Sequence, residues 1–187
     1  LDLSMFYHPD TERELLALRD HLSRNKKAED QFIQLLALSR LHGHSKGFFS
    51  VYSFPQISVT QEAQSRINEK RNQKPEYRDV ARLIMRKAKN VLRDDELELI
   101  NKFGSQSQVH ISDASSLKEI SDNSIDLIIT SPPFLNKADY LQDNWLELWF
   151  CDIDPKPVRE KLVMTARLNA WQEFIKASMR QMHRVLK

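Results

Sequence analysis

The first half of the chain places hydrophobic residues at the three- and four-residue spacing of amphipathic helices. Leu15, Leu18 and Leu22 follow this spacing, and Asp10-Thr11-Glu12 ahead of them offers capping residues for a first helix. Further helices are expected at 30–41, 75–93 and 95–103. The aromatic stretch 47–60 contains proline and predicts a loop with room for one short strand.

After Gly104 the hydrophobic pattern changes. Residues 108–111 predict a short strand, and residues 125–130 predict a second one, whose largely apolar run is typical of a parallel strand covered on both faces. Helical spacing then returns at 140–150, 157–164 and 168–186. The sequence therefore predicts an α/β fold with a parallel sheet flanked by helices, in which a helical region at 1–104 precedes the sheet-containing part at 105–187.

Length and composition narrow the class of protein. The 187 residues suit one ordinary domain, and 41% hydrophobic with 29% charged residues is typical of a globular chain. No apolar run approaches the roughly 18 residues that cross a bilayer, and the start lacks the pattern of a secretion signal. A single cysteine, Cys151, excludes an internal disulfide. We therefore expect a cytoplasmic protein with no membrane partner.

The net charge of +2 conceals one strongly basic segment. Between Arg66 and Arg93, ten lysine and arginine residues face three acidic ones, a difference of +7. Such a segment can neutralise the phosphates of a nucleic acid by counterion release, and Arg82, Arg86 and Lys89 are its candidate contacts. The alternative is an ordinary solvated helix face.

The main chemical motif is Ser131-Pro132-Pro133-Phe134, at the end of the second predicted strand. Two consecutive prolines neither extend a ladder nor begin a normal helix, so they form a rigid extended turn. The carboxyl ends of parallel strands border the ligand crevice of open sheets, which would place Ser131 beside a substrate. A purely structural strand-exit turn is the alternative.

These residue types suit the methylation of an exocyclic amino group, whose lone pair is delocalised into the base. A serine oxygen and the Pro132 carbonyl can accept the two amino hydrogens and favour a tetrahedral nitrogen that attacks a methyl donor in line. The aromatic ring of Phe134 can stack on a base that has been rotated out of the duplex.

The stretch 126–134 resembles the signature of amino-methyltransferases that modify cytosine N4 or adenine N6 in DNA, which is Ser, Asp or Asn followed by Pro-Pro and an aromatic residue. The resemblance covers about 108–187. Fainter likenesses to bacterial and archaeal DNA methylases lie at Tyr7-His8-Pro9 and 47–50. The resemblance implies a Rossmann-like methyltransferase fold, S-adenosylmethionine as cofactor and DNA as partner. Serine in the first position favours cytosine N4, with adenine N6 as the alternative.

The resemblance also implies roles for residues around the motif. Asp113 and Ala114 match the family's strand that ends in an acidic residue near the cofactor adenine, although Asp113 equally suits a helix cap. Tyr140 and Asn144 are candidates for the base pocket, whereas Glu147 on the same face is expected to be solvated. His42 and His44 lack a third ligand in reach, so no metal is predicted.

One departure from the family is large. Its cofactor loop needs an aromatic residue and Gly-x-Gly after a strand, and the three glycines here are not arranged so. Either the chain is a fragment, or a second polypeptide supplies that loop, or catalysis has been lost. Methylation of a protein glutamine or an RNA base is a second enzymatic hypothesis, and a noncatalytic DNA-binding or partner subunit is a third.

Overall fold

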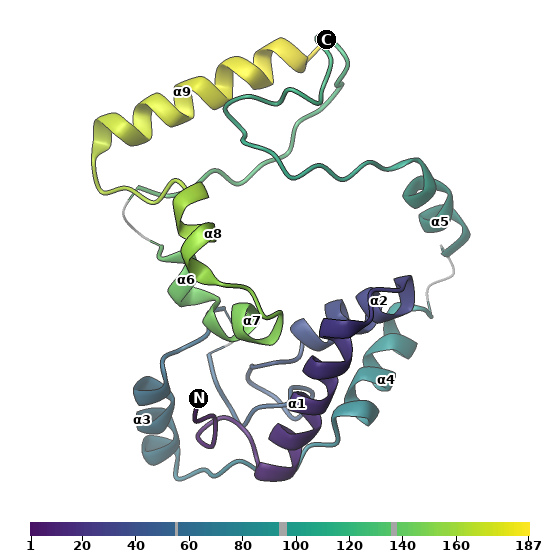
Figure 1. Ribbon diagram of the computed structural model, residues 1–187, viewed down its shortest axis with the longest axis vertical. Coiled ribbons are helices and arrows are strands. Elements are labelled where there is room, and N and C mark those ends of the chain that lie inside the picture. The colour runs from purple at the N-terminus through teal and green to yellow at the C-terminus, as the bar shows by residue number, and fades with distance from the viewer. Residues whose placement is uncertain (55, 94–96, 136–137) are drawn as a thin grey trace. The chain divides into compact units, whose positions relative to one another are not determined.

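The computed structural model describes residues 1–54, 56–93, 97–135 and 138–187. Its contacts define two compact units, which we treat separately: unit 1 is Leu1–Glu98 with Tyr140–Pro155, and unit 2 is Leu99–Asp139 with Lys156–Lys187. The helices in the described ranges are α1 (Pro9–Arg24), α2 (Ala28–Leu38), α3 (Gln61–Arg71), α4 (Val80–Val91), α5 (Leu97–Gln106), α6 (Tyr140–Asp143), α7 (Trp145–Phe150), α8 (Pro155–Lys161) and α9 (Leu168–Val185), as Figure 1 shows.

The predicted α/β fold with a parallel sheet is wrong. Within the described residues, β pairing is limited to isolated bridges between Gly43 and Tyr52 and between Ile125 and Leu186. Both predicted strands lack regular secondary structure, and most of their apolar side chains are exposed, with Val109 at 91% and Ile129 at 89%.

The reason for this error is physical. A hydrophobic run becomes a buried strand only where neighbouring strands take up its backbone hydrogen bonds and another layer covers its side chains. In unit 2, the run 125–130 obtains such bonds at its first residue, where the Ile125 amide donates to Val185 and the Lys187 amide donates to the Ile125 carbonyl at 3.1 Å. A Rossmann-like sheet is therefore not formed by the described residues.

The core of unit 1 lies where α1, α2 and α4 pack together, and Figure 1 shows these helices side by side. The apolar faces meet there because each helix repeats its large hydrophobic residues every three or four positions. The buried members include Leu15 and Leu22 from α1, Leu36 from α2, and Leu83 and Ile84 from α4.

The ends of these helices differ from the sequence-based expectation. The N-cap of α1 is His8, whose Nδ1 accepts a hydrogen bond from the Asp10 amide at 3.2 Å. Thr11 is instead buried, and its hydroxyl both accepts from the Arg78 amide and donates to the Arg78 carbonyl. The helix expected from residue 75 begins at Val80, because Asp79 caps it through the Arg82 amide at 2.8 Å.

The N-terminal residues connect the loops of unit 1 to α7. The Tyr7 hydroxyl donates to the Leu41 carbonyl at 3.0 Å, and the Phe6 ring contacts the Trp145 ring edge-on at 5.8 Å. The indole of Trp145 donates in turn to the Val59 carbonyl at 3.0 Å. The loop that follows α2 and the segment before α3 are therefore both joined to the start of α7.

Unit 2 is organised around α9. Arg184, in its last turn, donates to the carbonyls of Leu117 and Ile120 and forms an ion pair with Asp122. This one side chain holds the turns at 117–122 beside the helix end. In the part of the chain that the structure describes, no helix has the length and apolar character needed to cross a membrane.

Candidate functional site

The diproline motif lies on an exposed segment of unit 2. Ser131 and Pro132 are exposed, and the Phe134 ring is 68% exposed. Pro133 is half-buried, and its carbonyl accepts a hydrogen bond from the indole Nε1 of Trp171 on α9 at 2.8 Å. The turn is thus held at one backbone oxygen, while the hydroxyl and the ring on either side of it remain open to a ligand.

The two predicted cofactor residues also belong to unit 2. One carboxylate oxygen of Asp113 accepts hydrogen bonds from both the hydroxyl and the amide of Ser115, each at 2.7 Å. These bonds hold the pKa of Asp113 below its ordinary value. Asp113 is exposed and Ala114 half-buried. The local geometry is therefore that of a capped turn.

The residues of this chain do not fit a complete S-adenosylmethionine site. Residues 108–113 are exposed, so none of the described residues covers the place where the resemblance puts the adenine of the cofactor. The sequence also lacks a glycine loop whose amides would meet the rest of that molecule. A site for this cofactor needs residues beyond those that the structure brings together.

The two predicted base-pocket residues lie in unit 1. Tyr140 begins α6, and Asn144 stands between α6 and α7. The Asn144 amide donates to the Tyr140 carbonyl at 2.8 Å, so its nitrogen serves the local turn. Tyr140 is half-buried and Asn144 is exposed.

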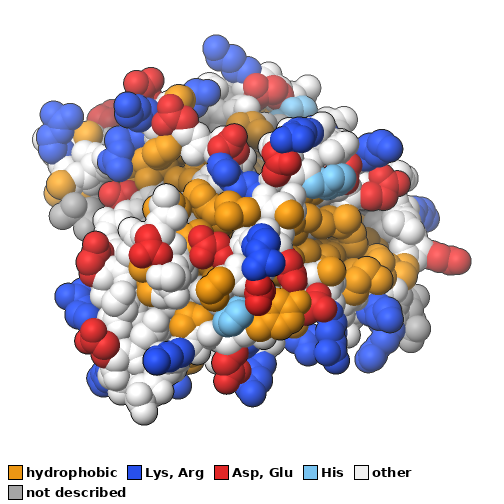
Figure 2. Space-filling model, turned by 60° about the horizontal axis from the view of Figure 1, so that its bottom comes forward, with side chains coloured by type: hydrophobic (Ala, Val, Ile, Leu, Met, Phe, Trp, Pro, Cys, Tyr) orange, Lys and Arg blue, Asp and Glu red, His pale blue; other side chains and the backbone are white. Residues whose placement is uncertain are grey.

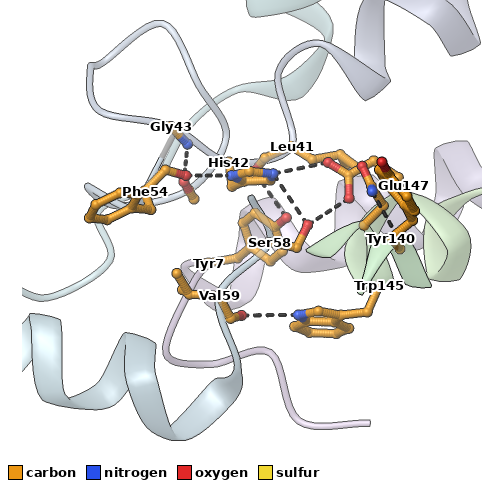
Figure 3. A network of polar contacts seen from close by, with 12 residues as sticks. Tyr7, Leu41, His42, Gly43, Phe54, Ser58, Val59, Tyr140, Trp145 and Glu147 are labelled. Carbon is orange, nitrogen blue, oxygen red and sulfur yellow. Dashed lines mark hydrogen bonds and ion pairs between the residues drawn. The ribbon is translucent and has the colours of Figure 1, made fainter. Parts of the chain in front are cut away.

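A polar network in the interior of unit 1 was missed by the sequence analysis (Figure 3). Nε2 of His42 lies 2.9 Å from Oε1 of Glu147, and Nδ1 lies 2.8 Å from the Phe54 carbonyl. The Ser58 hydroxyl donates to Oε2 of Glu147 at 2.6 Å and lies 3.3 Å from Nε2. The side chain of His42 is 7% exposed and that of Glu147 is 27% exposed.

Both ring nitrogens of His42 face an oxygen that can accept, and the imidazolium form satisfies both because it carries a proton on each nitrogen. Burial alone would lower the pKa of His42, but the hydrogen bonds to Glu147 and Phe54 and the charge of Glu147 together raise it. Burial alone would raise the pKa of Glu147, but the hydrogen bonds from His42 and Ser58 lower it. Both pKa directions favour the charged forms of His42 and Glu147, which together make a hydrogen-bonded ion pair.

The geometry of this network suits positioning rather than nucleophilic catalysis. In a serine hydrolase triad the serine and the carboxylate bond to opposite nitrogens of the histidine, whereas Ser58 and Glu147 both approach Nε2. Ser58 is also 2% exposed, which denies a substrate access to its oxygen. The network instead ties the loops around His42 and Ser58 to α7.

The expectation that Glu147 is solvated is therefore wrong. The sequence does contain one indication of this network. Glu147 lies in the middle of the apolar helix sequence Trp145–Phe150, and a carboxylate in a buried helix needs a hydrogen-bond or charge partner. Among the described residues, no group of three or more His, Cys, Asp or Glu side chains could hold a metal ion.

The basic face of unit 1 lies on the outer side of α4. Arg82, Arg86 and Lys89 are exposed, whereas Leu83 and Ile84 point into the core. A surface groove of about 510 Å³ runs among Arg82, Met85, Arg86, Lys89, Asn90 and Arg93. Figure 2 shows that charges of both signs mix with apolar side chains over one face of the molecule. Residues 66–93 differ from this mixture because they contain ten cations and three acids.

Comparison with known proteins gives one relevant similarity. The chain is 37% identical over 73 residues to the type II methyltransferase M.BsoBI of Geobacillus stearothermophilus. The match covers 37% of this chain and 14% of that protein, so the chain spans a small part of the relative's length. No protein-family model matches the chain, and no solved structure matches it.

Proposed function

We propose that this chain carries the amine-recognition part of an S-adenosylmethionine-dependent DNA methyltransferase that acts on cytosine N4, with adenine N6 as the alternative target. The carrying observation is the exposed Ser131-Pro132-Pro133-Phe134 turn, held from α9 through Trp171. The similarity to a type II methyltransferase supports methyl transfer as the reaction class.

In this proposal each residue of the turn has its own role. The Ser131 hydroxyl and the Pro132 carbonyl accept the two hydrogens of the target amine, which directs the nitrogen lone pair toward the methyl donor. Phe134 stacks on the extruded base, and Pro133 stiffens the turn. The Pro133 carbonyl is already bonded to Trp171, which leaves the Pro132 carbonyl as the acceptor next to the serine.

The methyl donor would be bound with the help of a glycine-rich loop that this sequence lacks. We propose that the loop comes from a further segment or a second polypeptide, with Asp113 and Ala114 bordering the cofactor. Tyr140 and Asn144 belong to unit 1, and their role as base-pocket residues stays a prediction. When bound, S-adenosylmethionine supplies an activated methyl group. The part of this chain is to hold and orient the acceptor amine.

A methyl-transfer assay tests the function directly. The chain, alone and mixed with the product of the adjacent reading frame, is incubated with tritiated S-adenosylmethionine and unmethylated DNA, and the digested nucleosides are separated. We expect label in N4-methylcytosine when a glycine-loop polypeptide is present.

Label in N6-methyladenine would support the alternative target. Methylation by the chain alone would contradict the need for a second polypeptide. No methylation in any mixture would overturn the enzymatic proposal and favour a noncatalytic DNA-binding subunit, for which the missing glycine loop is the supporting observation.

The basic face of α4 is proposed to contact DNA phosphates. Replacing Arg82, Arg86 and Lys89 together by alanine should weaken duplex binding and lower the slope of log affinity against log salt by about 3, or about one unit for each lost phosphate contact. Fluorescence anisotropy at several salt concentrations measures both quantities. Unchanged affinity and slope would identify this face as an ordinary solvated surface.

A further inference from the structure

Two arginines converge on the single glycine of the loop 45–48 in unit 1. The position that a Cβ atom would occupy on Gly47 lies 3.4 Å from Nη2 of Arg86 and 3.7 Å from Nη1 of Arg40. Gly47 does not have a positive φ, so its backbone conformation is open to any residue. The Ser45 hydroxyl oxygen lies 3.5 Å from the same position, so the two guanidinium tips and this hydroxyl gather beside the Gly47 backbone, where no side chain stands between them.

Neither guanidinium is neutralised within the described residues, where no carboxylate lies within ion-pair distance of Arg40 or Arg86. Burial and then the positive charge of Arg86 lower the pKa of Arg40, although an arginine remains protonated at physiological pH. The Arg40 guanidinium lies over the Phe48 ring in a cation–π contact, with its central carbon 4.8 Å from the ring centroid. Two like charges are thus held near each other without a counterion among the described residues.

A third arginine holds the loop that these two enclose. Nη1 of Arg78 lies 3.4 Å from the Ser45 carbonyl and 3.3 Å from the Phe48 carbonyl, and donates to both. Arg78 and Ser45 also line a second groove of about 650 Å³, together with the cations Lys46, Arg71 and Lys74 and the acid Glu76. Arg78 therefore links the Gly47 loop to a groove in which cations outnumber acids.

We propose that Arg40, Gly47 and Arg86, supported by Arg78, form a phosphate-binding site, hereafter the Gly47 site. A tetrahedral anion seated against the Gly47 backbone between the two arginine tips would accept from both arginines, whose planar groups match phosphate geometry. The cations of the second groove suit a ligand with repeating phosphates, so the ligand is a phosphodiester of the DNA backbone. This identification of the ligand rests on the proposed function.

The sharpest test is Gly47→Ala, because it adds a methyl group beside both arginine tips without changing any charge. Its Cβ would stand in ordinary van der Waals contact with both guanidinium groups, so folding should be preserved. We expect duplex affinity to fall at least about 10-fold, which is the low end for the loss of one charge-assisted contact. Arg40→Gln should give a similar fall and lower the salt slope by about one.

Matched controls separate this effect from general changes. Gly104→Ala introduces the same methyl group where nothing lies within 4 Å, and Arg24→Gln removes the same charge from an exposed pair with Asp20. Each variant of the full chain is titrated against a duplex of about two helical turns by fluorescence anisotropy. A parallel arm measures the thermal stabilisation of each variant by inorganic phosphate.

The outcomes distinguish the site from the proposed function. If Gly47→Ala and Arg40→Gln bind duplex like the two controls, the site as a DNA contact is overturned. Stabilisation of the wild-type chain, but not these variants, by inorganic phosphate with unchanged duplex binding would assign the site to a free phosphate and likewise reject the DNA ligand. A wild-type chain that binds no duplex would contradict both the site and a DNA substrate.

Discussion

Replacing Glu147 by alanine is expected to lower the free energy of unfolding of unit 1 by about 3 kcal/mol near pH 6, because it leaves the buried imidazolium of His42 without its counterion. The Ser58 hydroxyl loses its acceptor in the same substitution. We place the effect at the low end for buried ion pairs because the Glu147 side chain keeps 27% of its exposure.

The pH dependence of this effect follows from the two pKa directions. The pKa of His42 is raised on folding, so its contribution is present below the ordinary histidine value of 6.5 and is lost as the pH rises through the folded value. The pKa of Glu147 is lowered, so its contribution is present above 4.5 and is lost as the pH falls through the folded value. The difference between wild type and variant should be greatest between about pH 4.5 and 6.5.

Urea unfolding at acidic, mildly acidic and alkaline pH measures this difference. Tryptophan fluorescence in a Trp171→Phe background reports unit 1 alone, because Trp145 and Trp149 then carry the signal. Asp20→Asn is the matched control, since it breaks an exposed pair with Arg24 and should cost less than about 1 kcal/mol. Equal losses for the two variants near pH 6 would remove the case for a charged internal pair.

Ser131→Ala is expected to reduce the kcat of methyl transfer at least about 100-fold in the complete enzyme, with little change in the KM for DNA. The serine oxygen is proposed to act mainly as the amine nitrogen becomes tetrahedral, so its loss affects the transition state more than binding. Ser131→Asn keeps an acceptor oxygen at this position and should retain more activity. The exposed Ser105→Ala on α5 controls for the loss of a hydroxyl.

Phe134→Ala should act differently, through substrate binding. Losing one stacked base costs about 1 to 3 kcal/mol, which corresponds to a rise in KM of about 5- to 150-fold. Phe103→Ala on α5 removes another exposed ring and should leave KM unchanged. Tritiated methyl transfer at varied DNA concentration separates the two constants. Activity within 3-fold of wild type in both Ser131→Ala and Phe134→Ala would contradict the assigned roles.

Helices with a long apolar repeat were predictable from the sequence. α9 was expected at 168–186 and is found at Leu168–Val185, because its spacing is local information. α3 was missed since its sequence is almost entirely polar. Its one buried side chain, Gln64, donates hydrogen bonds to the Tyr52 carbonyl and to Asn68. A hydrophobic pattern cannot predict a helix that is held by polar contacts of this kind.

The parts that failed depend on residues far apart in the chain. His42 and Glu147 are separated by 105 positions, and neither sits in a motif that points to the other. The two strands were expected because apolar runs were equated with burial, yet burial depends on partners that the run itself does not specify. The Ser131 motif was recognisable because four adjacent residues carry it, although its proposed role still depends on experiment.

The link between Trp171 and the diproline turn reaches a main-chain oxygen rather than a side chain. Exchanging the residues at 131 and 134 therefore leaves that connection intact, and substrate preference can be altered by mutation without loosening the support behind it. The same hydrogen bond makes Trp171 a fluorescence probe. In a variant that keeps tryptophan only at position 171, a change in emission would report that a bound base moves or rigidifies the backbone at Pro133.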